Sequence, residues 1–232
     1  MAGAILFFLL VQRYGFGLLS GVIQEKSGRV VELLLPAVGP VDLLAGKVVG
    51  SGLVVLAQAA AFAVTALLSA VAVGSSILRG SGAGSIAVSF AWIAIGFFFY
   101  ATLYTAAGSL ASKPEDAQSV ALPLQLPLFL GYLVAFTAIG SGSANGLVEV
   151  LAYLPPTAPL DMPVLAATGG ASAIDVIVSM AICVAGTVVV ARLAATIFAR
   201  SILHTGSRLK ARKVLREVPD ASIAVSLLSD NA

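Results

Sequence analysis

Long apolar runs dominate the chain and predict five membrane-crossing helices. The runs cover approximately Ala2–Ile23, Val48–Val73, Ser85–Ala111, Ser119–Gly140 and Ile174–Ala199. Each run exceeds the roughly 18 apolar residues that mark a helix long enough to cross a bilayer. The stretches between them are short and polar or rich in Gly and Ser, with no linker typical of a second soluble domain. We therefore predict an all-α integral membrane protein, with one transmembrane domain over residues 1–217 and a flexible tail over 218–232.

Composition excludes an ordinary water-soluble domain. Hydrophobic residues make up 59% of the chain and charged residues 10%, whereas a soluble domain is about 25% charged. The single cysteine, Cys183, supports no disulfide framework. The single histidine, His204, lies in the tail, which excludes a membrane Ser-His protease and a His-based metal site. We expect no metal and no cofactor on this chain.

The positions of Lys and Arg predict the orientation, because cytoplasmic loops accumulate these residues. Lys26, Arg29 and Lys47 surround the first connection, and Lys113 lies in the third. The opposite side holds only Arg79. The tail carries six cations: Arg200, Arg208, Lys210, Arg212, Lys213 and Arg216. We therefore predict a multi-pass protein of the plasma membrane with its amino terminus outside and its carboxyl terminus in the cytoplasm.

The stretch Gln24–Lys47 predicts an amphipathic elbow in the cytoplasmic interface. Glu25, Arg29 and Glu32 follow one another at i, i+4 and i+7, so a helix places them on one face, with Glu25 and Arg29 in a favourable order for an ion pair. Pro36 and the pair Gly39-Pro40 break this helix, and Pro40 is suited to open the next one. A solvated connector that only anchors to lipid headgroups explains the same pattern equally well.

Polar residues inside the apolar runs mark a candidate pathway: Gln12 and Arg13 in the first run, and Gln125 in the fourth. An arginine at the bilayer centre costs about 2.5–3.5 kcal/mol on insertion scales, so Arg13 should face a bundle interior or a watery cavity. A buried structural role explains Arg13 as well as a pathway role does. Pro123 and Pro127, on either side of Gln125, predict a kink.

A stripe of small residues in the third run predicts close helix packing. Ala101, Thr105 and Ser109 repeat at four-residue spacing in the third run, and such small residues let helices approach closely in lipid.

The basic stretch 200–217 predicts a tail helix on anionic headgroups or, as the sharper alternative, a contact with a partner protein.

Three ordered motifs resemble the type-2 ABC exporter permeases, especially the group known as sodium-extruding ABC permeases. They are GVIQEKSGRVVELLLPAVGPVDLLAGKVVG, ASKPEDAQSVALPLQLPLFLGY and YLPPTAPLDMPVLAATG, and the basic tail is also similar to the carboxyl terminus of that group. The resemblance implies a transmembrane permease domain that works as a homodimer or heterodimer and exports its substrate from the cell. It does not indicate which substrate is carried.

The resemblance also implies how the chain is powered. The elbow would dock on a separate ABC ATP-binding subunit through Glu25, Lys26, Arg29 and Glu32, with ATP and Mg²⁺ held by that partner. The chain has no GxxxxGK[ST] loop of its own, because Val48 follows Gly46-Lys47 and position 41 is Val. We therefore expect a transporter subunit and not an enzyme. Nucleic-acid binding is not expected.

The third motif resembles an external re-entrant segment that helps to close the pathway. Its implied residues are Pro155, Pro156, Pro159 and Asp161. The prolines also fit a rigid loop. Asp161 departs from the family pattern, in which an apolar residue is more usual. Family members usually begin with one more helix and an external domain, so a truncated permease fragment and a non-transporting membrane anchor or assembly protein are the alternatives.

Overall fold

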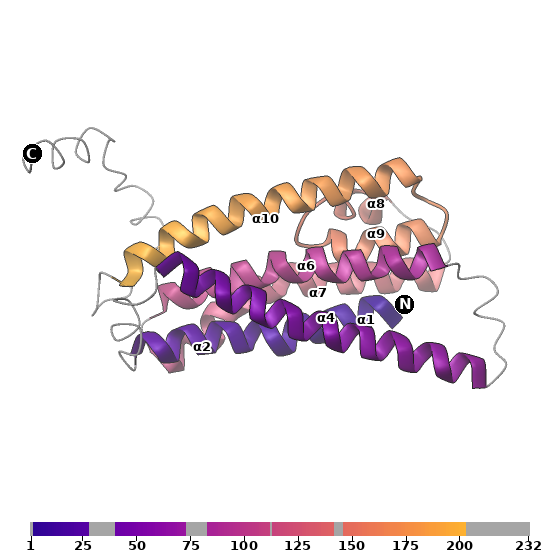
Figure 1. The fold of residues 1–232 in the computed structure, drawn as a ribbon. Helices are drawn as coiled ribbons and strands as arrows, with labels where there is room; N and C mark the ends of the chain where they lie inside the picture. Colours follow the sequence, from indigo (N-terminus) through magenta and orange to yellow (C-terminus); the bar gives the residue numbers. More distant parts are fainter. Residues whose placement is uncertain (1, 28–39, 73–82, 112, 142–145, 203–232) are drawn as a thin grey trace, which may run out of the picture.

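The computed structural model describes residues 2–27, 40–72, 83–111, 113–141 and 146–202. They form an elongated bundle of helices (Figure 1). The first rod joins α1 (Ala2–Leu10), a π-helical turn η1 (Val11–Gly15) and α2 (Phe16–Ser27). The other long helices are α4 (Pro40–Ala72), α6 (Ala83–Leu110), α7 (Ala117–Ser141) and α10 (Ala173–Ile202). Short elements complete the fold: the 3₁₀ turn η2 (Pro114–Asp116), α8 (Gly146–Leu151) and α9 (Ala158–Ala167).

These helices confirm the all-α membrane architecture. Within the described residues, five segments are long and apolar enough to cross a bilayer: Gly3–Ser27, Asp42–Ser69, Val88–Leu110, Pro114–Gly140 and Ala173–Thr196. The second helix begins earlier than the apolar run indicated, at Pro40 and not near Val48. Proline fits the first helical position, and Asp42 in the first turn is favourable beside the positive end of the helix dipole.

Helix α6 forms the centre of the bundle. Its apolar stretch is 56% buried, whereas that of α10 is only 11% buried. The large side chains of Trp92, Phe97, Tyr100 and Tyr104 are all buried on it. Much of the apolar surface of α4 and α10 is exposed, as expected for helices that face lipid or another subunit.

The predicted small-residue stripe lies inside the bundle. Ala101, Thr105 and Ser109 are all fully buried. Near them, a Cβ placed on Gly108 would lie 2.7 Å from the backbone oxygen of Leu19. The absence of side-chain bulk at this position of α6 therefore lets α2 approach it at backbone distance.

The predicted re-entrant stretch, with Pro155, Pro156, Pro159 and Asp161, forms the loop that follows α8 and the first turns of α9. Gly169, with φ of +77°, ends α9 in the left-handed conformation that glycine adopts easily. Helix α10 then begins with a capping box, in which Asp175 accepts hydrogen bonds from the backbone N–H and hydroxyl of Ser172. These two signals turn the chain from the short helix into the last long one.

Several predicted features lie wholly or mainly outside the described residues. They include residues 28–39 of the elbow, the basic tail helix beyond Ile202 and the tail over 218–232. Helix α7 continues through Pro123 and Pro127.

Candidate functional site

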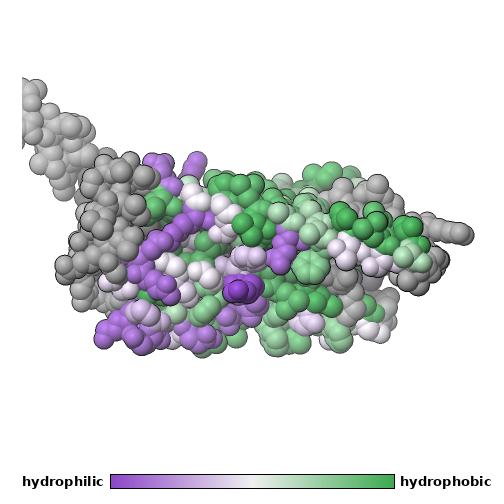
Figure 2. Space-filling model, turned by 60° about the horizontal axis from the view of Figure 1, so that its bottom comes forward, coloured by the Kyte–Doolittle hydropathy of each residue, from purple (hydrophilic) through white to green (hydrophobic). Residues whose placement is uncertain are grey.

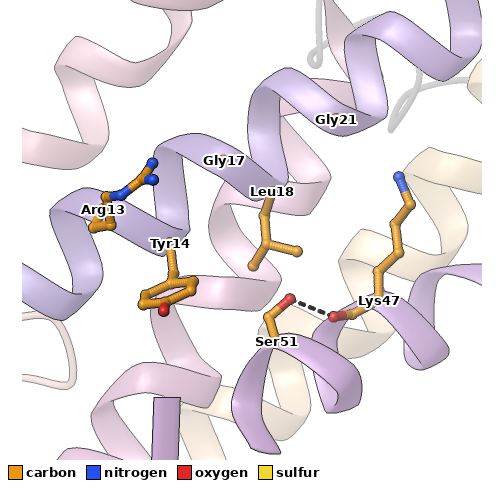
Figure 3. Close-up of a pocket in the computed structure, with 7 residues that line it drawn as sticks. All are labelled: Arg13, Tyr14, Gly17, Leu18, Gly21, Lys47 and Ser51. Atoms are coloured by element: carbon orange, nitrogen blue, oxygen red, sulfur yellow. Dashed lines mark hydrogen bonds between the residues drawn. The ribbon is translucent and has the colours of Figure 1, made fainter. Parts of the chain in front are cut away.

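A groove of mixed polarity runs between the first rod and α4. It has a volume of about 340 Å³ and is lined by Arg13, Tyr14, Gly17, Leu18, Gly21, Lys47 and Ser51. Figure 3 shows Tyr14 and Leu18 reaching down from the first rod toward α4, with Lys47 rising beside them. Gly17 has no neighbouring atom within 4 Å of a built Cβ, so its surface stays open. The groove is therefore open, partly lined by glycine, and carries a few polar side chains on a helix pair that crosses the membrane.

Arg13 lies in the π-helical turn and is exposed. Within the part of the chain that the structure describes, it forms no salt bridge; the ion pair found there joins Lys47 to Glu25. A π-helical turn inside an α-helix is uncommon and often marks a functional site. An exposed, unpaired arginine at mid-span is costly against lipid. The Arg13 side of the groove is therefore suited to face water, a polar ligand or another protein surface.

The Tyr14 side of the same turn is fixed to α4. The Tyr14 hydroxyl donates a hydrogen bond to Gln58 Oε1 at 2.8 Å. Gly15 faces inward, where a built Cβ would lie 2.7 Å from the Tyr104 ring. The turn thus fits tightly against α6 on one side while presenting Arg13 on the other.

Charged contacts join three helices at the predicted cytoplasmic end. Glu25 near the end of α2 forms an ion pair with Lys47 of α4, with 2.5 Å between carboxylate and ammonium. Lys26 donates a hydrogen bond to the Ser109 backbone oxygen of α6 at 2.9 Å. Hydrophilic residues gather toward this end of the molecule (Figure 2). The sequence predicts an ion pair between Glu25 and Arg29, four residues away. It gives no signal for Lys47, which lies 22 positions after Glu25.

The α8–α9 segment is tied to the bundle through its backbone oxygens. Tyr100 of α6 donates a hydrogen bond to the Pro156 oxygen at 2.6 Å. Ser179 of α10 donates to the Ala152 oxygen at 2.5 Å, and the Cys183 thiol lies 3.7 Å from the Pro155 oxygen. Proline cannot donate from its own nitrogen, but its carbonyl remains an acceptor. The prolines therefore give a stiff loop that side chains of α6 and α10 hold in place.

Asp161 lies in α9, most of whose residues are buried. Its side chain is fully buried, and neither carboxylate oxygen has a hydrogen-bond partner among the described residues. Burial raises the pKa of Asp161 to about 8, because desolvation penalises the charged form. Sequence reasoning singled out Asp161 as unusual, but the proline-rich context gave no signal that the carboxyl would be buried without a partner.

The structure brings some predicted residues together and separates others. Glu25 and Lys26 lie at one end of α2, while Arg29 and Glu32 lie outside the described residues. Arg13 lines the groove, but Gln12 has a buried Oε1 without a hydrogen bond to the described residues, and Gln125 lies beside Tyr104. Of the three candidate pathway residues, Arg13 is therefore the one that lines the groove.

Comparison with known proteins identifies the family. A family model described as "ABC-2 family transporter protein" matches residues 1–196. The chain belongs to the ABC-2 transporter family. This membership and the five membrane-crossing helices agree on a membrane component of a transporter. The match supports the broader family and does not single out the sodium-extruding group.

Two relatives of the ABC-2 chain extend beyond the region it matches. It is 30% identical over 151 residues to the uncharacterized protein YhaP of Bacillus subtilis (strain 168), covering 61% of this chain and 36% of that protein. It is 25% identical over 201 residues to the uncharacterized protein MJ1024 of Methanocaldococcus jannaschii, covering 86% of this chain and 48% of that protein. The chain thus spans between a third and a half of these relatives. No solved structure matches it.

Proposed function

We propose that the chain is the membrane-spanning permease subunit of an ATP-driven exporter, powered by a separate ABC ATP-binding subunit. The family match over residues 1–196 carries this proposal. The elbow motif and the absence of a phosphate-binding GxxxxGK[ST] loop from the sequence support an energy source outside this chain.

The charged contacts at the predicted cytoplasmic end suggest how force would enter the bundle. The segment between Ser27 and Pro40 connects α2 to α4, and the Glu25–Lys47 ion pair joins the two helices directly beside it. Lys26 adds the link to α6. A partner that pushes on this connection would move α2 and α4 together, because the ion pair also joins the two helices.

The groove supplies a candidate for the transport pathway. Its open side and the exposed Arg13, which has no ion-pair partner among the described residues, suit a surface that is completed by a second permease subunit. Substrate would then pass between the two subunits. ATP binding would bring the two elbows together and tilt the helices, alternating the access to the groove.

Co-purification with an ABC ATP-binding subunit tests the partnership. We expect the full-length gene product to capture the ATPase, and failure to do so in the presence of nucleotide would refute the proposal. Joint charge reversal of Glu25 and Arg29 should weaken capture more than reversal of Arg79 on the predicted opposite side. Equal losses would contradict the elbow assignment.

A charge exchange separates a direct contact from an internal brace. E25K and K47E each break the ion pair, whereas the double variant E25K/K47E restores it with reversed order. If the pair acts as a brace, the double variant should recover the nucleotide-dependent ATPase stimulation that each single variant loses. If Glu25 instead binds the ATPase directly, the double variant should stay as defective as E25K.

Transport in vesicles distinguishes an exporter from a membrane anchor. Uptake into inside-out vesicles that requires ATP supports export, and sodium is the first substrate to test because the ordered motifs resemble the sodium-extruding group. An ATPase that binds the chain without ATP-dependent transport of any tested ion, drug, lipid or peptide would favour a non-transporting anchor or assembly protein.

A further inference from the structure

Asp161 is unusual among the described carboxylates because the fold gives it neither exposure to solvent nor a partner. Its exposure is 0%, and both oxygens lack hydrogen bonds to the described residues. A Cβ on Gly131 of α7 would lie 3.3 Å from Oδ2, so the carboxyl occupies space that the glycine leaves free. A buried carboxylate without a partner is strongly disfavoured, whereas a neutral carboxylic acid is tolerated at much lower cost.

Two hydroxyl groups in the neighbourhood of Asp161 already donate their protons elsewhere. Thr157, one turn before Asp161, donates to the Leu151 oxygen at 2.6 Å. Tyr100, which interacts electrostatically with Asp161, donates to the Pro156 oxygen at 2.6 Å. Neither hydroxyl is therefore free to stabilise a carboxylate while these hydrogen bonds last.

No cation compensates for the missing donors within the described residues. The titratable groups on the elements packed against α9 are Tyr100 and Tyr104 on α6, Tyr132 on α7, Glu149 on α8, and Asp175, Cys183, Arg192 and Arg200 on α10. Arg192 is exposed and lies nine residues beyond Cys183, about 14 Å further along α10, and Arg200 lies further on still. Helix α1 has none, and Tyr153 in the preceding loop donates to Asp175. No group of three metal-ligating side chains occurs within these ranges. The site is therefore suited to a proton and lacks the ligands that a metal ion needs.

We propose that Asp161 is a proton-binding site of the α8–α9 segment, occupied while the segment is packed in the bundle and emptied when the segment opens to water. On opening, the carboxyl O–H bond breaks, the proton passes to water and the hydrated carboxylate remains. On closing, the carboxylate takes up a proton before it is buried again. This inference concerns the segment itself and stands whether or not ATP drives the transporter.

The contacts that hold the segment show what must separate. Tyr100 to the Pro156 oxygen and Ser179 to the Ala152 oxygen tie it to α6 and α10. Pro159 also fits against Gly96, where a built Cβ would lie 2.6 Å from the proline ring. Ionised Asp161 favours the open arrangement, so higher pH should loosen this packing.

Infrared difference spectroscopy of the full-length protein in lipid bilayers tests the proton directly. We expect a protonated-carboxyl C=O band that disappears near pH 8, about four pH units above an ordinary aspartate. The band should be absent from D161N and retained in E149Q, whose carboxyl is exposed on α8. A spectrum unchanged in D161N, or a band that disappears near pH 4, overturns the proposal.

Cys183 provides a second readout within the same region, because its buried thiol faces the Pro155 oxygen. Maleimide labelling, normalised to the thiol in unfolded protein, should rise about tenfold per pH unit as pH increases toward 8 in the wild type, since opening is linked to loss of one proton. In D161N the normalised labelling rate should not change with pH. Equal pH dependence in both overturns the coupling to opening.

Replacing Na⁺ with choline distinguishes a proton site from a sodium site. A titration midpoint that does not change with Na⁺ supports the proposal, and a midpoint that falls as Na⁺ rises overturns it in favour of a metal cation. If D161N does not assemble, D161L serves as the assignment variant. If neither assembles, the wild-type titration decides: a band lost near pH 8 supports the proposal, and no such band overturns it.

Discussion

The close approach of α2 and α6 makes Gly108 the sharpest test of the packing. In G108A the new Cβ would lie 2.7 Å from the Leu19 oxygen, 3.2 Å from the Leu19 Cα and 3.2 Å from the Val22 Cβ. The Leu19 atoms belong to the backbone and cannot rotate away. Because favourable contacts between heavy atoms lie near 3.5 Å, α2 would have to move by about 0.8 Å.

Such overpacking costs about 1–3 kcal/mol in free energy of unfolding. G50A is the matched control, because Gly50 lies on a helix with no atom within 4 Å of a built Cβ. Both variants gain the helix preference of alanine over glycine, about 1 kcal/mol. The difference between them therefore isolates the steric cost.

Thermal unfolding of both variants in one detergent measures this difference. At about 2–4 °C per kcal/mol for a chain of this size, G108A should unfold about 2–12 °C below G50A. The displacement should also disturb the Lys26 hydrogen bond to α6, one residue beyond Gly108. An unfolding temperature for G108A equal to or above that of G50A would refute the predicted close contact.

The α8–α9 segment and the charged end of the bundle give three more predictions. First, the pKa of Asp161 is raised to about 8 in the folded protein from an unfolded value near 4. Its contribution to the free energy of unfolding is therefore complete below about pH 4 and is lost as pH rises to about 8, at about 1.4 kcal/mol per pH unit. Urea or heat unfolding across this pH range should show that slope in the wild type and not in D161N. Second, Y100F removes the hydrogen bond to Pro156 and should destabilise by about 0.5–1.5 kcal/mol with faster Cys183 labelling, whereas an unchanged rate would mean that this bond does not hold the segment. Third, the Glu25–Lys47 pair is partly exposed, so a double-mutant cycle should give only about 0–1 kcal/mol in stability, and a much larger coupling would contradict the solvent-screened geometry.

Sequence reasoning located the membrane-crossing helices because apolar length is a direct physical requirement of the bilayer. It placed the start of the second helix eight residues late, since Pro40–Lys47 is mixed in polarity and was assigned to the elbow. The helix nevertheless begins at Pro40, the residue that fitted the first helical position.

The site residues were harder to predict, because their neighbours lie far away in sequence. Arg13 was recognisable from its mid-span charge alone. The π-helical turn that carries it and the bond from Tyr14 to Gln58 depend on tertiary packing. Likewise, the isolation of Asp161 depends on Gly131 and on hydroxyl groups committed to other acceptors, which no local pattern reveals.

The π-helical turn has a consequence for how the first rod tolerates changes in length. A π-helical hydrogen bond spans one residue more than an α-helical one. Val11–Gly15 therefore contains roughly one residue more than a regular α-helix would need to join the two flanking helices. Deleting one residue there can be absorbed by conversion to regular α-helix, leaving both flanking halves facing their present neighbours. The same deletion within α6 has no such reserve and would turn everything beyond it by about 100°, carrying Tyr100 and Tyr104 out of the core.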